Sequence, residues 1–350
     1  MIVTDAWFPQ TNGVVRTLAH TAAWLGRFGH EVRTLTPRDF KSVPCPTYPE
    51  IRLSLWPAKG VEEAIRAFVP QCLHIATEGP LGYAARRYCL SHGMRFTTSY
   101  HTQFPQYLRA RFPVPIRASY GLLRRFHGAG VRCMVSTPTL RQELAARGFK
   151  NLATWRRGVD TEIFKPRPKD FLSLPRPIAA YVGRVAIEKN IDAFMRMPWH
   201  GSKLVIGDGP ERARLQSQYR DAVFAGYRFE DDLARHLAAA DVMVFPSRTD
   251  TFGLVNLEAM ACGVPVAAYP VTGPIDVIAD GITGALDEDL GRAASRALEI
   301  DPRACREQAL KYGWDASTRE FEGNLVLCHA TGPEESGAPA GVGKASLIRS

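Results

Sequence analysis

Two carboxylates eight positions apart, Asp250 and Glu258, are the residues whose types and spacing most clearly suggest chemistry. An apolar run over residues 242–246 predicts a buried strand before them, and apolar residues recur at helical spacing from Phe252. The first carboxylate therefore lies in the loop that follows a strand, and the second lies inside the next helix. Open α/β sheets bind ligands at this end of their strands.

The start of this helix predicts an anion site. A helix that begins near Phe252 and Gly253 points unpaired backbone N–H groups at a ligand above it, and Gly253 has no Cβ to keep a phosphate away. A carboxylate beside a phosphate is electrostatically unfavourable, so we expect Asp250 and Glu258 to accept hydrogen bonds from sugar hydroxyls. The pattern indicates a site for a sugar attached to a phosphate.

Other strand ends supply further polar groups. Arg184 and Lys189 follow a predicted strand over 178–182 and are close enough in sequence to reach one anionic group, although two exposed basic residues on a surface loop are the alternative. Gly13 precedes a predicted helix in an Asn-Gly turn, which is common in plain turns. His101 ends the strand 96–100, where a lone His is more often structural than catalytic.

The acidic stretch FPSRTDTFGLVNLEAMACGVPV resembles the acidic motif of retaining glycosyltransferases of family 4, FPS-x-x-E-x-FG-x-x-x-x-E-A-M-A-x-G-x-P-V. Every fixed position matches except the first Glu, which is Asp250 here. The resemblance implies that Asp250 binds the donor sugar and Glu258 the nucleotide ribose. It also implies that three backbone amides contact the phosphate and the sugar, those of Phe252, Gly253 and Leu254. The shorter Asp leaves the identity of the donor sugar open.

Three more segments carry the same resemblance. The loop before VVRTL implies that Gly13 lies against the donor diphosphate. The segment SYHT implies that His101 contacts the donor sugar near the reacting carbon. The motif G-R-x-x-x-x-K implies that Arg184 and Lys189 bind the diphosphate. Tyr227, at the end of a predicted strand over 222–226, is a candidate neighbour of the nucleobase. The residues expected to act in catalysis are His101, Arg184, Lys189 and Asp250.

The alternation of strands and helices predicts an α/β protein with two doubly wound parallel sheets. The resemblance implies the GT-B fold, in which two Rossmann-like domains face each other across a cleft. We expect an acceptor-binding domain over 1–170, a nucleotide-sugar-binding domain over 171–312, a helix over 313–330 that crosses back to the first domain, and a disordered tail over 331–350. The sequence leaves open whether Met1 is the true start.

The chain carries a net charge of +9, and its distribution is uneven. No acid lies between Glu78 and Glu143, whereas ten Arg do, and over 103–132 they alternate with aromatic and aliphatic residues. This composition is typical of an amphipathic segment on anionic lipid. The alternatives are a solvated basic face and nucleic-acid binding, which no recognised module supports. The expected membrane or acceptor surface consists of Arg109, Arg111, Arg117, Arg124 and Arg125.

The bulk composition favours a cytoplasmic protein. No run of 18 apolar residues occurs, and the N-terminus lacks a basic and then apolar signal sequence. Seven Cys without metal-ligand spacing indicate thiols in a reducing compartment. With the Arg-rich segment, we expect peripheral attachment to the inner face of the cytoplasmic membrane.

The segments TDAW-x-P-Q-x-NGVVRTL and TEGPLG with SYHT resemble bacterial lipid glycosyltransferases and GDP-mannose-dependent alpha-mannosyltransferases. Together with the Arg-rich segment, this resemblance implies a retaining hexosyltransferase. Its expected donor is GDP-mannose, UDP-glucose or UDP-glucuronate, and its expected acceptor is a membrane lipid such as diacylglycerol, phosphoinositide or ceramide. We expect no cofactor and no metal requirement, because no DxD cluster lies in a plausible loop, and no nucleic-acid partner. Transfer to a lipopolysaccharide or polysaccharide is the alternative. A non-catalytic nucleotide-sugar-binding protein is disfavoured because Lys189 and Glu258 are both present. The nucleobase, the acceptor and the oligomeric state stay open.

Overall fold

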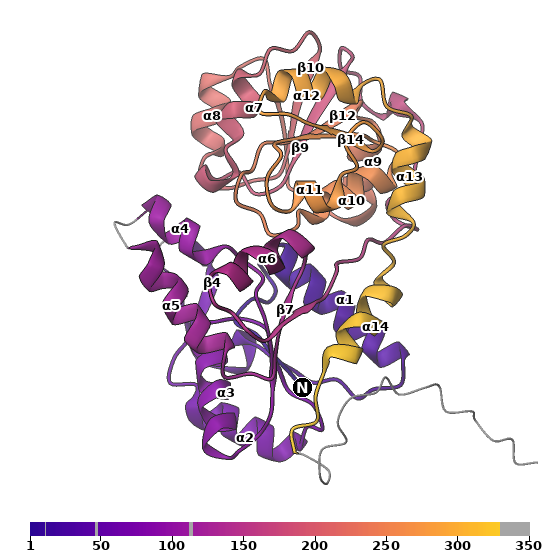
Figure 1. The fold of residues 1–350 in the computed structure, drawn as a ribbon. Helices are drawn as coiled ribbons and strands as arrows, with labels where there is room; N and C mark the ends of the chain where they lie inside the picture. Colours follow the sequence, from indigo (N-terminus) through magenta and orange to yellow (C-terminus); the bar gives the residue numbers. More distant parts are fainter. Residues whose placement is uncertain (11, 46–47, 112–114, 330–350) are drawn as a thin grey trace, which may run out of the picture.

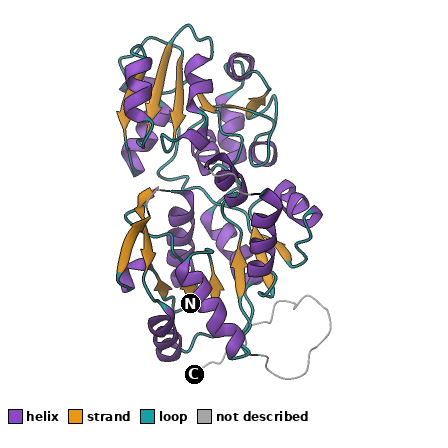
Figure 2. Ribbon diagram, turned by 90° about the vertical axis from the view of Figure 1, so that its left-hand side faces the viewer, coloured by secondary structure: helices purple, strands orange, loops and turns teal. Residues whose placement is uncertain are grey.

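Two lobes, each built on a parallel six-stranded sheet with helices on both faces, make up the chain (Figures 1 and 2). This computed structural model describes residues 1–10, 12–45, 48–111 and 115–329. Strand order is β2-β1-β5-β6-β7-β8 in the first sheet and β11-β10-β9-β12-β13-β14 in the second. The prediction of two doubly wound parallel sheets is confirmed.

The first lobe alternates strands and helices from the N-terminus. Asn12 caps the first helix, because its side-chain oxygen accepts from the amides of Val14 and Val15 at 3.0 Å each. The strands are β1 (Ile2–Val3), β2 (Thr34–Leu35), β5 (His74–Ile75), β6 (Thr97–Ser99), β7 (Arg132–Val135) and β8 (Leu152–Thr154). The helices are α1 (Gly13–Arg27), α2 (Ala58–Phe68), α3 (Pro80–Ser91), α4 (Phe104–Arg111), α5 (Ile116–His127) and α6 (Pro138–Ala146).

The segment 41–59 is Pro-rich and shows no clear strand or helix period in the sequence. It forms an antiparallel hairpin of β3 (Ser42–Cys45) and β4 (Tyr48–Ser54), and then enters α2. The hairpin was not predicted because its Pro residues and its lack of alternation hide the strand period.

The second lobe has the strand order of a dinucleotide-binding sheet. Its central strand β9 is buried along its whole length, as expected for a parallel strand covered on both faces. The strands are β9 (Ile178–Val182), β10 (Ser202–Ile206), β11 (Val223–Gly226), β12 (Val242–Phe245), β13 (Val266–Ala268) and β14 (Gly284–Leu286). The helices are α7 (Ile191–Arg196), α8 (Arg212–Gln218), α9 (Glu230–Ala238), α10 (Leu254–Ala261), α11 (Pro274–Val277), α12 (Leu290–Ala297) and α13 (Pro302–Ala309).

The order of the strands fixes where a ligand site can form. In the first sheet the strand order reverses between β1 and β5, and in the second between β9 and β12. The loops that leave these strands lead to α1, α3, α7 and α10. Ligands of open α/β sheets bind at such switch points, so the loops around Gly13, Arg184 and Asp250 lie where binding is expected.

The last helix, α14 (Trp314–Asn324), returns to the first lobe and packs beside α1 (Figure 1). Phe321 is fully buried there, with its ring 4.6 Å from that of Trp155 and 4.8 Å from that of His74. The chain passes between the lobes over residues 155–177, a stretch that contains the predicted boundary near residue 170. The predicted disordered tail lies outside the described residues.

Replacing Phe321 by Ala is expected to lower the stability of the first lobe by about 3–5 kcal/mol, because a large buried aromatic leaves a cavity. Urea unfolding followed by tryptophan fluorescence measures the shift. Leu310→Ala, at an exposed side chain after α13, is the control and should change little. Equal shifts for the two variants would contradict a structural role for α14.

Candidate active site between the two lobes

The acidic loop of the second lobe runs from the end of β12 to the start of α10. Gly253 caps α10 with φ of 81°, a left-handed conformation that favours glycine. A Cβ at this position would lie 2.6 Å from the side chain of Asn256 and 3.0 Å from that of Phe245. Glycine is therefore required here by backbone and space. Phe252 is buried in the core, whereas Leu254 is half-buried.

Residues of the first lobe contact this acidic loop directly. The Thr251 hydroxyl donates to the carbonyl of His101 at 2.7 Å, and the Ser136 hydroxyl donates to the carbonyl of Thr251 at 2.8 Å. A Cβ on Gly13 would lie 3.3 Å from the Leu254 side chain. The strand ends of the two sheets therefore meet, and Gly13 and His101 lie against the loop that was predicted to bind the donor.

Each carboxylate of the acidic motif is paired with a cation. Lys189 Nζ donates to both oxygens of Asp250, at 2.7 and 2.8 Å. Arg16, on α1 of the first lobe, forms an ion pair with Oε1 of Glu258, whose side chain belongs to the second lobe and is 4% exposed. The other oxygen, Oε2, is buried without a hydrogen-bond partner among the described residues. Glu258 thus keeps one oxygen able to accept a further hydrogen bond.

His101 is buried where the first lobe contacts the acidic loop. Burial first, and the charge of Arg157 next, hold the pKa of His101 well below its ordinary value. Its Nδ1 lies 3.2 Å from Nη2 of Arg157, and its ring meets that of Trp155 edge to face at 5.6 Å. The imidazole is therefore neutral at physiological pH.

Arg184 and Tyr227 are the remaining residues that were predicted to bind the donor. Arg184 follows β9 at the switch point of the second sheet; it is half-buried, and its carbonyl accepts from the Tyr181 hydroxyl at 2.7 Å. Tyr227 follows the edge strand β11, is 40% exposed, and stacks on Phe229 with ring centroids 5.9 Å apart. The contacts described above between the two lobes involve neither of these side chains, so their roles stay predictions.

The predicted membrane surface falls on α4 and α5, at the outer edge of the first lobe beside the junction of the lobes (Figure 1). Arg109, Arg117, Arg124 and Arg125 are exposed, whereas the side chain of Arg111 lies outside the described residues. Leu122 is exposed among the α5 arginines, and Phe104 is exposed at the start of α4. Gln103, just before α4, donates to the carbonyl of Asp250 at 3.5 Å, so this surface begins beside the acidic loop.

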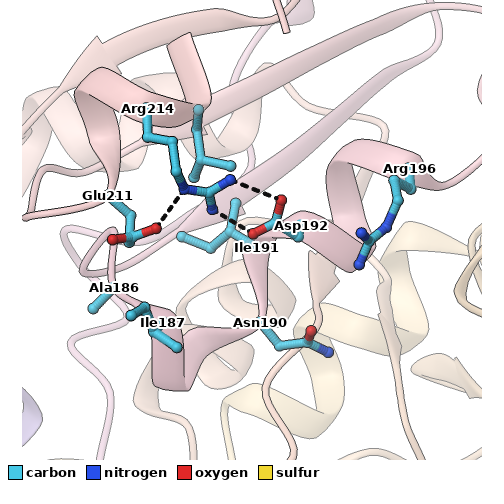
Figure 3. Close-up of a pocket in the computed structure, with 9 residues that line it drawn as sticks. Ala186, Ile187, Asn190, Ile191, Asp192, Arg196, Glu211 and Arg214 are labelled. Atoms are coloured by element: carbon cyan, nitrogen blue, oxygen red, sulfur yellow. Dashed lines mark hydrogen bonds and ion pairs between the residues drawn. The ribbon is translucent and has the colours of Figure 1, made fainter. Parts of the chain in front are cut away.

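A hollow of about 470 Å³ lies elsewhere on the second lobe, between the loop after β9 and helix α8 (Figure 3). Arg214 projects into it and donates to Glu211 at 2.6 Å and to Asp192 at 2.5 Å. These side chains are already paired with one another, and they join α8 to α7. We therefore place the candidate site at the junction of the lobes and not in this hollow.

Comparison with known proteins agrees with this geometry. Residues 11–163 match the Glycosyltransferase Family 4 domain, and residues 176–300 match the Glycosyl transferases group 1 domain. A GDP-mannose-dependent alpha-mannosyltransferase of Mycobacterium tuberculosis is 31% identical, over 81% of this chain and 82% of that protein. The chain belongs to glycosyltransferase family 4. As a family 4 member it is a glycosyltransferase, as the resemblance implied.

Two further proteins are similar to this family 4 protein. The sulfoquinovosyl transferase SQD2 of Arabidopsis thaliana is 29% identical, over 92% of this chain and 72% of that protein. The structure of Anabaena HepE in complex with UDP and glucose superposes with a TM-score of 0.69 at 14% identity, covering 92% of this chain and 97% of HepE. The predicted GT-B fold is confirmed.

Two arginines of this family 4 transferase were missed as site residues. Arg16 was not singled out, although it lies three positions after Gly13 and therefore on the same face of α1. Arg157 lies in the segment WRRGVD, where nothing in the sequence marks it as a neighbour of His101. Across the described residues, no group of three or more His, Cys, Asp and Glu side chains is arranged to hold a metal ion.

A double-mutant cycle on Arg16→Met and Glu258→Gln is expected to show a coupling of about 1–2 kcal/mol in unfolding free energy. We expect a coupling energy at the low end of the range for close charge pairs, because the Arg16 side chain is one-third exposed. The control is the exposed pair Lys59 and Glu63, where we expect no measurable coupling. Additive effects at Arg16 and Glu258 would show that the pair does not join the lobes.

Proposed function

We propose that this protein is a retaining hexosyltransferase that moves a sugar from a nucleotide sugar, with GDP-mannose the first candidate, to a membrane lipid. The observation that carries the proposal is the meeting of Gly13 and His101 of the first lobe with the acidic loop of the second. GDP-mannose is favoured because the mycobacterial relative carries that donor in its name. UDP-glucose and UDP-glucuronate are the other donors to compare.

The proposed chemistry follows from the charges around the loop. Lys189, Arg184 and the amides at the start of α10 bind the diphosphate and stabilise the charge that grows on it as the glycosidic bond breaks. Asp250 and Glu258 accept hydrogen bonds from sugar and ribose hydroxyls.

Transfer then proceeds on one face of the sugar. The acceptor oxygen bonds to the anomeric carbon, the bond from that carbon to the phosphate oxygen breaks, and the acceptor's proton passes to the leaving phosphate. The anomeric configuration is retained. The cations and the helix start supply the positive charge in this proposal, so we expect activity without added metal.

A thermal-shift panel of GDP-mannose, UDP-glucose and UDP-glucuronate, followed by radiolabelled transfer to a total lipid extract, tests the function. A donor at 100 times its Kd stabilises the protein by about 2.7 kcal/mol, so the true donor should raise Tm by several degrees. Lys189→Met should lower turnover roughly 100-fold and weaken donor binding much less, since the charge acts mainly in the transition state.

The control variant is Lys59→Met, on the exposed face of α2, which should transfer normally. Activity should persist in EDTA, and its complete loss would overturn the metal-independent mechanism. A protein that binds a donor but labels neither lipid nor glycan would favour the non-catalytic alternative.

The lipid acceptor is supported by the surface formed by α4 and α5. Its exposed side chains combine arginines with Leu122 and Phe104, the composition of a peripheral contact with anionic lipid. The surface starts next to His101 and Asp250, so a headgroup bound on it would lie near the reacting sugar. No described helix is long and apolar enough to cross a bilayer. A lipopolysaccharide or polysaccharide acceptor is the alternative, and labelled glycan without labelled lipid would support it.

Binding to vesicles that contain anionic lipid should fall about 100-fold in the triple variant Arg117→Gln, Arg124→Gln and Arg125→Gln, since each surface arginine contributes roughly fivefold. The matched control removes three exposed arginines of α12 and α13, Arg292, Arg296 and Arg303, each by substitution with Gln. Vesicle co-sedimentation at 50 and 300 mM salt measures both, and salt should weaken wild-type binding. Equal losses in the two triple variants would indicate that only net charge matters.

A further inference from the structure

Arg157 is a buried guanidinium that the proposed chemistry does not use. It is 4% exposed, and its Nη1 donates to the carbonyl of Trp155 at 2.8 Å. Its guanidinium carbon lies 4.2 Å from the centre of the fully buried Trp155 ring. The carbonyl and the indole hold the planar group in one orientation, with Nη2 directed at Nδ1 of His101, 3.2 Å away.

The contact with His101 has only one consistent assignment of protons. A guanidinium carries N–H donors and no acceptor, so Nδ1 of His101 must be the acceptor. A neutral imidazole with an unprotonated Nδ1 carries its proton on Nε2. Protonation of Nδ1 would instead place a second N–H against Nη2 and a second positive charge beside the first. Arg157 therefore selects one tautomer and disfavours the imidazolium.

The other groups around His101 also favour a neutral ring. His74 and His127 are the other titratable groups that act on its ring, and a positive charge on either would oppose protonation of His101. The pKa of His74 is itself lowered to about 3 by burial, so His74 adds no charge at neutral pH. The backbone carbonyl of His101 is engaged by Thr251 from the second lobe. Nε2 is buried and has no hydrogen-bond partner among the described residues, although it must carry a proton.

We propose that Arg157 is a positioning residue that fixes His101 as a neutral Nε2–H donor aimed at an oxygen of the donor sugar. This rests on the proposed function, which gives His101 its substrate. His101 is then unable to accept the proton of the acceptor hydroxyl. That proton passes to the leaving phosphate oxygen, which receives the electron pair of the broken bond, while the acceptor oxygen bonds to the anomeric carbon.

The first test reads the tautomer directly in the full chain without any donor. Histidine labelled with ¹³C and ¹⁵N gives the state of each ring nitrogen by NMR, and His101→Gln identifies the His101 signals among the nine histidines. We expect a protonated Nε2, an unprotonated Nδ1 and no titration of His101 between pH 5.5 and 8. A protonated Nδ1, or titration within that range, in the wild-type protein would overturn the proposal. This measurement needs no variant at Arg157.

The second test compares transfer rates from pH 5.5 to 8 in Arg157→Met and Arg157→Lys. Without the guanidinium the pKa of His101 should rise toward its ordinary value near 6.5, although burial still lowers it. A protonated ring would place positive charge beside the anomeric carbon, where positive charge develops as the glycosidic bond breaks. The kcat/KM of Arg157→Met should therefore fall between pH 7.5 and 5.5 relative to wild type, by at most about tenfold. Arg157→Lys keeps a charged donor and should keep the wild-type profile. A purely structural role would lower the rate equally at every pH, and that result would contradict the proposal.

The two tests separate the two hypotheses. If no donor is transferred, the proposed function fails while the NMR measurement still decides the tautomer. If transfer occurs and His101 titrates normally in the wild-type protein, the proposed function stands and the role of Arg157 fails.

Discussion

Two ion pairs hold the carboxylates of the acidic motif, and the arrangement of the junction between the lobes depends on them. Glu258 is almost fully buried, and a buried carboxylate without a cation is costly, so Arg16 must reach it from the other lobe. Asp250 is paired through both oxygens with Lys189 of its own lobe. One pair joins the lobes and the other shapes the loop at the start of α10. Together they fix the side chains on which the proposed donor site is built.

The proposed function would exchange the Lys189 pair for a contact with substrate. A diphosphate attracts Lys189 more strongly than one carboxylate does. Ribose hydroxyls can donate to Oε2 of Glu258, which has no partner among the described residues, while Arg16 stays paired with Oε1. Lys189 neutralises Asp250 and Arg16 neutralises Glu258 in this structure, so neither carboxylate lacks a counter-charge. This also gives a reason for Asp at position 250, because the shorter side chain still allows bidentate pairing with Lys189.

The sequence predicted those parts of the fold that local patterns determine. Strand β12 and helix α10 were predicted because an apolar run marks the strand and apolar residues at helical spacing mark the helix. Strand β8 and helices α12 and α13 were not predicted, since they are short and mostly polar or alanine-rich, and their packing decides their conformation. Arg16 could not be found as the partner of Glu258 because the two are 242 positions apart. Arg157 was missed for the same reason, since its partner His101 lies on a different strand end of the sheet.

The remaining contacts between the lobes explain why charge controls their junction. Among the described residues they include hydrogen bonds from short hydroxyls, such as Thr251 to the carbonyl of His101 and Thr139 to the carboxylate of Asp276 at 2.9 Å. The side-chain amide of Gln103 also donates across the junction, to the carbonyl of Asp250. The large apolar clusters stay on one side of the junction or the other. Water can replace such hydroxyl contacts at small net cost, whereas exposing an apolar core would be expensive. Separation of the lobes therefore breaks mainly polar contacts and the pair of Arg16 with Glu258, so whatever occupies Glu258 sets how firmly the lobes are held together.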